Sequence, residues 1–160
     1  MPPPYRHLAA ILFTDIVGFT ALMQQNEESA MGLIRRYHAV MNDSANSHNG
    51  EVVNDYGDGS LSLFHSATEA VACAIEVQQL LRVDPSVPLR IGLHVGEVLM
   101  ENGKVLGDAV NIASRIQSLG YANCILFSRE ICDKIRNHPE FIVAPLGSFH
   151  FKNVDQPMEI

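Results

Sequence analysis

The chain has 160 residues, of which 47% are hydrophobic and 18% charged, a composition typical of one globular domain with a substantial core. Its formal net charge of −7 argues against a surface that binds nucleic acid across the whole fold. No apolar stretch approaches the roughly 20 residues that a membrane-spanning helix needs. The N-terminal "MPPPYRH" lacks the apolar core of a signal peptide, so we expect a cytoplasmic domain without membrane insertion.

The cysteines and histidines predict neither a disulfide framework nor a zinc site. Cys73, Cys124 and Cys132 are odd in number and form no CxxC pair, which fits small core residues in a reduced compartment. The seven histidines show no metal-binding spacing such as HExxH. The last residues, "VDQPMEI", read as a strand just beginning, as expected of a domain excised from a longer protein.

The first half of the chain predicts a strand, a helix and a hairpin. An apolar run indicates a buried strand over 8–14, and apolar residues at spacings of three and four indicate a helix over 26–47, with Gly50 as its C-terminal cap. Two short strands over 51–56 and 60–64 are joined through "GDG", which predicts a hairpin.

The second half predicts alternating helices and strands. Ser66 and Glu69 form a capping box for a helix over 67–81. The stretch "LRIGLHVGEVLM" predicts one or two strands bent at Gly92 and Gly96. The remaining expectations are a helix over 109–119 capped by Asp108, a strand over 124–127, a helix capped by Ser128 and ending near Asn137, and late strands within 141–152.

This order of elements predicts a single α+β domain over residues 1–160. The β-α-β-β-α-β portion has the ferredoxin-like pattern. We therefore expect a mixed, mainly antiparallel sheet with helices packed on one face and extra C-terminal strands.

Two aspartates stand where strands end. Asp15 interrupts the apolar stretch "LAAILFTDIVGFT", and Asp58 lies in the hairpin turn "YGDGS". Each is explained by a turn or a helix cap when taken alone. If the first strand and the hairpin are neighbours in the sheet, however, the two carboxylates converge at one sheet end. Two carboxylates plus substrate phosphates are the usual setting of protein-bound Mg²⁺.

A third motif, "GDAVNIASR", places an amide and a guanidinium on one helix face. Asn111 and Arg115 are four residues apart, so both project from the same side. This pair suits an anionic, ribose-bearing ligand, although a solvated polar face is the favoured explanation when the motif is taken alone. Lys152, late in "FHFKN", could also reach a phosphate.

The motifs "FTDIVGFT", "YGDGSLSLF" and "LGDAVNIASR", in this order and at these separations, resemble the class III nucleotide cyclases, the adenylate and guanylate cyclase catalytic domain. The resemblance extends from Leu8 to about Pro157. It implies that Asp15 and Asp58 hold two Mg²⁺ or Mn²⁺ ions, with the Ile16 carbonyl contributing. The implied reaction converts a nucleoside triphosphate into its 3′,5′-cyclic monophosphate and pyrophosphate, a second-messenger synthesis.

The same resemblance assigns the remaining roles. Asn111 would orient the ribose, Arg115 would stabilise the transition state, and Lys152 would contact the triphosphate. Family members work as head-to-tail dimers in which the metal-binding half and the Asn/Arg half of a site come from different subunits. A homodimer is therefore implied. A non-catalytic cyclase-like module is the main alternative, but such domains usually lose a metal Asp or the transition-state Arg, and this chain keeps both.

Two positions depart from the family pattern. Adenylate cyclases typically read the base with Lys and Asp, and guanylate cyclases with Glu and Cys, where this chain has Asn54 and Lys104. Lys104 cannot accept a hydrogen bond from the adenine amine and would suit a carbonyl edge such as that of guanine or uracil, unless it points to solvent. ATP is the expected substrate from family frequency, with guanylate or pyrimidine cyclase as the alternatives.

Overall fold

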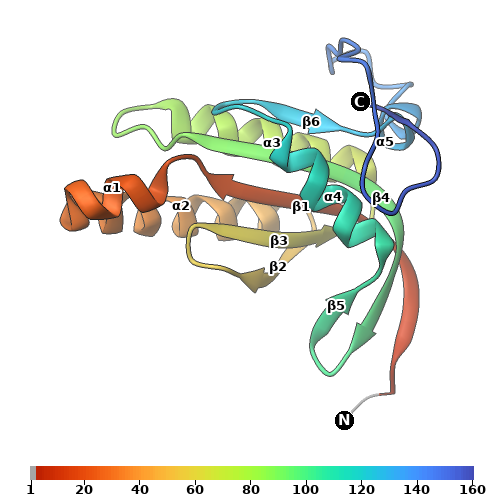
Figure 1. Cartoon of the computed structure of the whole chain (residues 1–160), viewed down its shortest axis with the longest axis horizontal. Helices are drawn as coiled ribbons and strands as arrows, with labels where there is room; N and C mark the ends of the chain where they lie inside the picture. The colour runs from red at the N-terminus through yellow and green to blue at the C-terminus, as the bar shows by residue number, and fades with distance from the viewer. Residues whose placement is uncertain (1–2) are drawn as a thin grey trace.

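A long strand, β1 (Tyr5–Ile16), occupies the middle of the sheet in the computed structural model, which describes residues 3–160 (Figure 1). The strand order is β2-β3-β1-β4-β5, with β6 added alongside β4. All pairs are antiparallel except β4 with β6, which confirms the predicted ferredoxin-like core. The other strands are β2 (Gly50–Asp55), β3 (Gly59–Phe64), β4 (Leu89–Glu101), β5 (Lys104–Leu106) and β6 (Ile125–Phe127).

Helices cover both faces of this sheet, so the expectation of helices on one face was wrong. Ala10 and Leu12 of β1 face the core formed with α2 and α3, whereas Ala9 and Ile11 face α4 on the other side, as strand alternation requires. In Figure 1, α2 and α3 lie behind the sheet and α4 lies in front. The helices are α1 (Phe19–Gln25), α2 (Glu27–Ser47), α3 (Ala67–Arg82), α4 (Asp108–Ser118) and α5 (Arg129–Lys134).

The glycines of β4 allow α4 to approach closely. β4 is one strand, continuous from Leu89 to Glu101, and it curves along its length in Figure 1. A Cβ atom on Gly92 would lie 2.3 Å from the backbone nitrogen of Gln117, and one on Gly96 would lie 2.6 Å from the Cβ of Ala109.

Several helix ends differ from the expected caps. Asn26 does cap α2, since its side chain accepts from the Ser29 N–H at 3.1 Å. The left-handed residue after α2 is Asn49, with φ 59°, while Gly50 already belongs to β2. At α4 the N-cap is Gly107, and Asp108 lies in the first turn.

The start of α3 follows the prediction in part, since Ser66 caps the helix but the Glu69 side chain does not complete the capping box, and the start of α5 agrees only in position. Ser66 accepts a hydrogen bond from the Glu69 N–H at 3.1 Å. Ser128 precedes α5, yet its hydroxyl pairs with Nδ1 of His94 at 2.7 Å and makes no capping bond. Helix α5 ends at Lys134, earlier than expected.

The C-terminal part contains little regular structure. Of the predicted late strands, only β7 (Ser148–Phe149) forms within 141–152, and it pairs with β8 (Met158–Glu159). The three cysteines are free thiols, and Cys73 is buried as expected of a core residue, whereas Cys124 and Cys132 are only half-buried. Among residues 3–160, no helix combines the length and the apolar character that crossing a membrane requires.

Candidate active site

One corner of the sheet brings the two predicted metal-binding aspartates together. Asp15, next to the end of β1, lies opposite Gly59 of β3 and opposite Arg90 of β4. The Ile16 N–H donates to the backbone carbonyl of Asp58 at 2.7 Å. Asp15, Ile16 and Asp58 therefore meet at one place, as the adjacency of β1 and β3 was expected to produce.

Arg90 neutralises Asp15 at this corner. Its Nη2 and Nε donate to Oδ2 of Asp15 at 2.9 and 3.2 Å, and both side chains are mostly buried, with 29% and 27% of their surfaces exposed. Because a carboxylate loses hydration on burial, the guanidinium compensates for that cost. Sequence reasoning missed Arg90. The available signal was a single cation opening the apolar strand "LRIGL", which pairs antiparallel with the strand that ends at Asp15.

A buried group of three hydroxyls lies on the other face of the same strand end. Thr14 Oγ1 is 2.5 Å from the Tyr37 hydroxyl and 2.9 Å from Ser60 Oγ, and Tyr37 donates to Ser60 at 2.5 Å. Burial raises the pKa of Tyr37 to about 12, so this phenol stays protonated at neutral pH. The three hydroxyls tie α2 to β1 and β3 beside both aspartates, a feature that was also missed.

The donor set at the corner fits Mg²⁺ or Mn²⁺ and does not fit zinc. It offers two carboxylates and backbone carbonyls, which are oxygen ligands for hard cations. Within residues 3–160 there is no group of three or more His, Cys, Asp or Glu side chains that could hold a metal. Two carboxylates alone suit ions that keep waters and bind substrate phosphates as further ligands.

Asn111, Arg115 and Lys152 are brought together at a second place. A cavity of about 280 Å³ is lined by Asn111 and Arg115 of α4 and by residues 153–155 of the C-terminal segment. Nη1 of Arg115 donates to the backbone carbonyl of Lys152. Asp15 and Asp58 are not among the lining residues, so the two groups of predicted site residues lie at separate places on the chain.

The two positions that depart from the family pattern lie on the edge strands. Asn54 belongs to β2 and Lys104 to β5, and these strands approach one another because the sheet curls (Figure 1). Nδ2 of Asn54 donates to the Tyr56 hydroxyl at 3.4 Å, which leaves the Asn54 carbonyl oxygen free to accept. Lys104 is exposed and lies opposite Glu101 in the β4–β5 hairpin.

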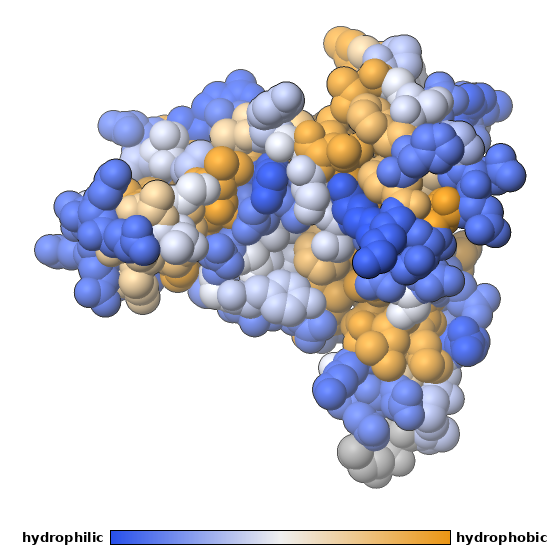
Figure 2. Space-filling model, viewed as in Figure 1, coloured by the Kyte–Doolittle hydropathy of each residue, from blue (hydrophilic) through white to orange (hydrophobic). Residues whose placement is uncertain are grey.

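The open face of the sheet beside α4 carries apolar side chains. Figure 2 shows hydrophobic residues gathered beside α4 and over β5. Leu106 has 44% of its surface exposed, and Tyr56, with 55% exposed, stacks on Phe13 with ring centroids 6.0 Å apart. The partly buried residues that pack at this face are Phe13, Val53, Leu63, Met100 and Val110.

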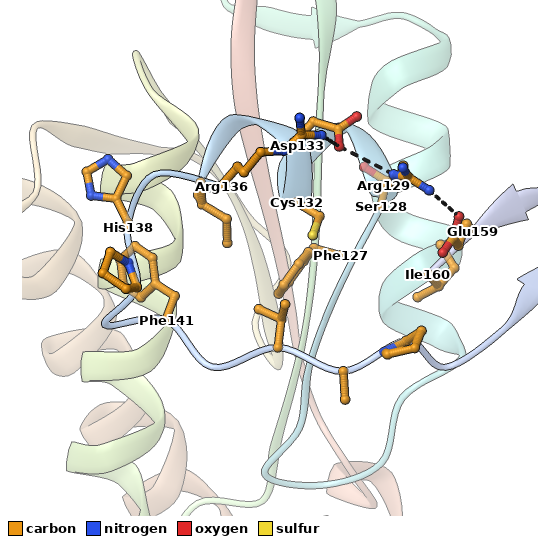
Figure 3. Close-up of a pocket in the computed structure, with 15 residues that line it drawn as sticks. Phe127, Ser128, Arg129, Cys132, Asp133, Arg136, His138, Phe141, Glu159 and Ile160 are labelled. Atoms are coloured by element: carbon orange, nitrogen blue, oxygen red, sulfur yellow. Dashed lines mark hydrogen bonds and ion pairs between the residues drawn. The ribbon is translucent and has the colours of Figure 1, made fainter.

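A further cavity, of about 480 Å³, lies between α5 and the C-terminal segment, and none of the predicted site residues lines it (Figure 3). Its floor includes Phe127, and its charged rim is internally paired. Arg129 binds Glu159 at 2.7 Å and Asp133 at 3.3 Å, as Figure 3 shows, and Arg136 binds Asp133 at 2.7 Å. The hydrogen bond from Arg136 lowers the pKa of the Asp133 carboxyl below its usual range.

The family model of the adenylate and guanylate cyclase catalytic domain matches residues 3–159. The chain belongs to this family. It is 32% identical, over 97% of its length, to a Rhizobium meliloti protein whose name assigns it provisionally to the adenylate cyclases, and 30% identical, over 79%, to an adenylate cyclase of Streptomyces coelicolor. It covers only 28% and 34% of those two proteins.

Among solved structures, the adenylate/guanylate cyclase/hydrolase of Silicibacter pomeroyi superposes with a TM-score of 0.89 at 28% identity, covering 98% of this chain and 96% of that one. The cyclase domain thus accounts for the whole fold described above.

Proposed function

We propose that this domain converts a nucleoside triphosphate, with ATP as the first candidate, into the 3′,5′-cyclic monophosphate and pyrophosphate. The observation that carries the proposal is the meeting of Asp15, Ile16 and Asp58 at one corner of a cyclase fold, with Asn111 and Arg115 on a separate helix face. When bound, two Mg²⁺ or Mn²⁺ ions would lower the pKa of the ribose 3′-hydroxyl and neutralise phosphate charge.

The side chains of this protein would supply the positioning. Asp15 and Asp58 hold the acidic end of the site, and the Asn111 amide hydrogen-bonds the ribose so that its 3′-hydroxyl faces the α-phosphate. The Arg115 guanidinium donates to the α-phosphate oxygens as their charge grows. Lys152 binds the triphosphate. In this conformation Nη1 of Arg115 donates to the Lys152 carbonyl, and the guanidinium has further N–H donors for a phosphate.

We infer that a complete site needs two copies of the chain. The Asp15/Asp58 corner and the Asn111/Arg115 cavity are separate in one protomer. The open apolar face between them suits a head-to-tail homodimer, in which each of these two half-sites meets its complement on the other subunit. A cytoplasmic setting matches a domain whose substrate is a nucleotide.

The base is the least constrained part of the substrate. Asn54 can accept through its carbonyl, but Lys104 only donates, so the pair does not match the adenine edge. We expect weak discrimination, with other nucleoside triphosphates turned over within roughly tenfold of ATP.

The test is a purified-protein assay with ATP, GTP, CTP or UTP and Mn²⁺ or Mg²⁺, following cyclic nucleotide and pyrophosphate together. Equal amounts of both products support the proposal. Nucleotide binding without any product would identify a non-catalytic cyclase-like module, and a thousandfold preference for one base would refute the expected weak discrimination.

A further inference from the structure

The turn that carries Asp58 needs support from outside its own hairpin. Asp58 has a glycine on each side, and Gly57 adopts φ 87°, with no atom within 4 Å of the place where its Cβ would be. Glycine has the widest conformational freedom of any residue, so this turn is intrinsically loose. The far side is fixed, because the Asp58 carbonyl accepts from the Ile16 N–H at 2.7 Å and Gly59 pairs with Asp15 in the sheet. The Gly59 carbonyl also accepts from the Tyr56 N–H at 2.9 Å.

The near side is held by His38 of α2. Nε2 of His38 lies 2.9 Å from the Gly57 carbonyl oxygen and 3.3 Å from Oδ1 of Asp55. The same Asp55 oxygen accepts from the Gly57 N–H at 2.8 Å, so the three residues close a ring of contacts. Among residues 3–160, His38 is the one side chain outside the hairpin that hydrogen-bonds to residues 55–58.

The chemistry of this contact fixes the state of the ring nitrogen. A carbonyl oxygen only accepts, so Nε2 must carry a hydrogen, as it does both in the neutral Nε2–H tautomer and in the imidazolium ion. The ring is also held from behind, because it packs against Tyr37 with centroids 5.3 Å apart, and Tyr37 is anchored by its bonds to Thr14 and Ser60. The contact therefore comes from a fixed helix onto a loose turn.

We propose that His38 is a positioning residue, which holds Gly57 and thereby aims the Asp58 carboxylate at the cation shared with Asp15. This inference rests on the proposed function in one respect, the assignment of Asp58 as a metal ligand. His38 itself touches neither metal nor substrate.

The test compares His38→Ala with His38→Gln, whose side-chain amide nitrogen can reach the Gly57 carbonyl. Two measurements are made on the full chain: hydrogen exchange of peptides covering residues 55–60 without metal, and Mn²⁺ binding followed by the electron paramagnetic resonance of free Mn²⁺. Loss of one such hydrogen bond predicts exchange and a Mn²⁺ dissociation constant each raised roughly two- to tenfold in His38→Ala. His38→Gln should stay near wild type.

His48→Ala is the matched control, because His48 is the C-cap residue of the same helix but its Nδ1 bonds to the Ser44 carbonyl at 2.8 Å. It should change neither measurement. Asp55→Ala, which opens the same ring from the other side, should reproduce His38→Ala and serves if that variant folds poorly. Unchanged exchange of the turn, or unchanged Mn²⁺ affinity, in both variants overturns the inference. A wild-type protein that binds Mn²⁺ but forms no cyclic product overturns the proposed function alone.

Discussion

Asp15 shows at the scale of one residue how an acidic site is kept stable within a folded domain. Its carboxylate is mostly buried at a strand end, and Arg90 from the neighbouring strand supplies the opposite charge at 2.9 Å. A bound cation would share that carboxylate with the guanidinium. The pair therefore connects the stability of the fold to the occupancy of the site.

We predict that Arg90→Gln lowers the free energy of unfolding by about 1–2 kcal/mol, because it leaves a partly buried carboxylate without its partner. Urea denaturation measures the change. In the double variant Asp15→Asn/Arg90→Gln the loss should be smaller than in Arg90→Gln alone, since the unpaired charge is gone. Additive losses in the double variant would show that the two side chains do not interact.

Asp58 should affect catalysis far more than folding. Its side chain lies in a turn outside the core, so Asp58→Ala should keep the far-UV circular dichroism and unfolding midpoint of the wild type. Turnover should fall by roughly a thousandfold or more, about 4 kcal/mol of lost transition-state stabilisation. Asp15→Ala should lose activity similarly. A variant of either aspartate that cyclises near the wild-type rate would contradict the assignment of that residue as a metal ligand.

At this scale the sequence predicted the acidic residues but missed their supports. Asp15 and Asp58 stand in recognisable local motifs. Arg90, Tyr37 and His38 act through the register of strands and helices that are distant in the chain, and no local pattern records that register. The residues to which these three side chains form hydrogen bonds are also distant in the chain, so the contacts depend on the finished fold.

At the scale of elements, the placement of α4 depends on two glycines of β4. The sequence analysis interpreted Gly92 and Gly96 as bends because glycine is rare inside strands. In the fold they leave room for the backbone of α4, so the helix that carries Asn111 and Arg115 lies directly on the sheet. Element types were predictable from periodicity, whereas the face chosen by α4 was not, because it depends on this packing.

We predict that Gly92→Ala destabilises the domain by at least about 2 kcal/mol, since its Cβ would lie 2.3 Å from the Gln117 nitrogen and neither backbone can yield easily. Gly32→Ala is the control. Gly32 lies inside α2 with nothing within 4 Å of the added Cβ, so alanine there should stabilise by up to about 1 kcal/mol. Equal unfolding midpoints for the two variants would refute the close-packing explanation.

His94 joins β4 to the start of α5 and should make stability depend on pH. Burial lowers the pKa of His94 below its usual 6.5, and Glu130 opposes this only partly. The unfolded chain then binds a proton more readily than the folded one. Stability contributed by neutral His94 is complete above pH 6.5 and declines as the pH falls toward the folded pKa.

His94→Asn keeps a polar group near Ser128 but does not titrate. The difference in unfolding free energy between wild type and His94→Asn should therefore shrink between pH 7.5 and pH 5.5, as measured by urea denaturation at each pH. A difference that grows on acidification would mean that the folded pKa of His94 is raised instead.

At the scale of the whole molecule, the Asp15/Asp58 corner and the Asn111/Arg115 cavity lie at separate places on one protomer, beside an open apolar face. In the proposed head-to-tail homodimer, each of these places is one half-site of a composite site. This arrangement makes a specific prediction for mixtures of inactive proteins. Asp15→Ala inactivates only the half-site formed by Asp15 and Asp58, and Arg115→Ala inactivates only the half-site formed by Asn111 and Arg115. In a head-to-tail dimer of one of each, both lesions fall in the same composite site, and the other composite site contains no substitution.

Asp15→Ala and Arg115→Ala proteins, each inactive alone, should therefore recover activity when mixed. With random pairing, half of the dimers are mixed and each has one intact site of two, so the mixture should reach roughly a quarter of the wild-type rate per protomer. Mixing Asp15→Ala with Asp58→Ala is the control, because both lesions affect the same half-site, and it should recover nothing. Subunit exchange is verified with two differently tagged chains. No recovery in the test mixture once exchange is complete would exclude a site shared between subunits, whereas recovery in the control would show that Asp15 and Asp58 do not act in the same half-site.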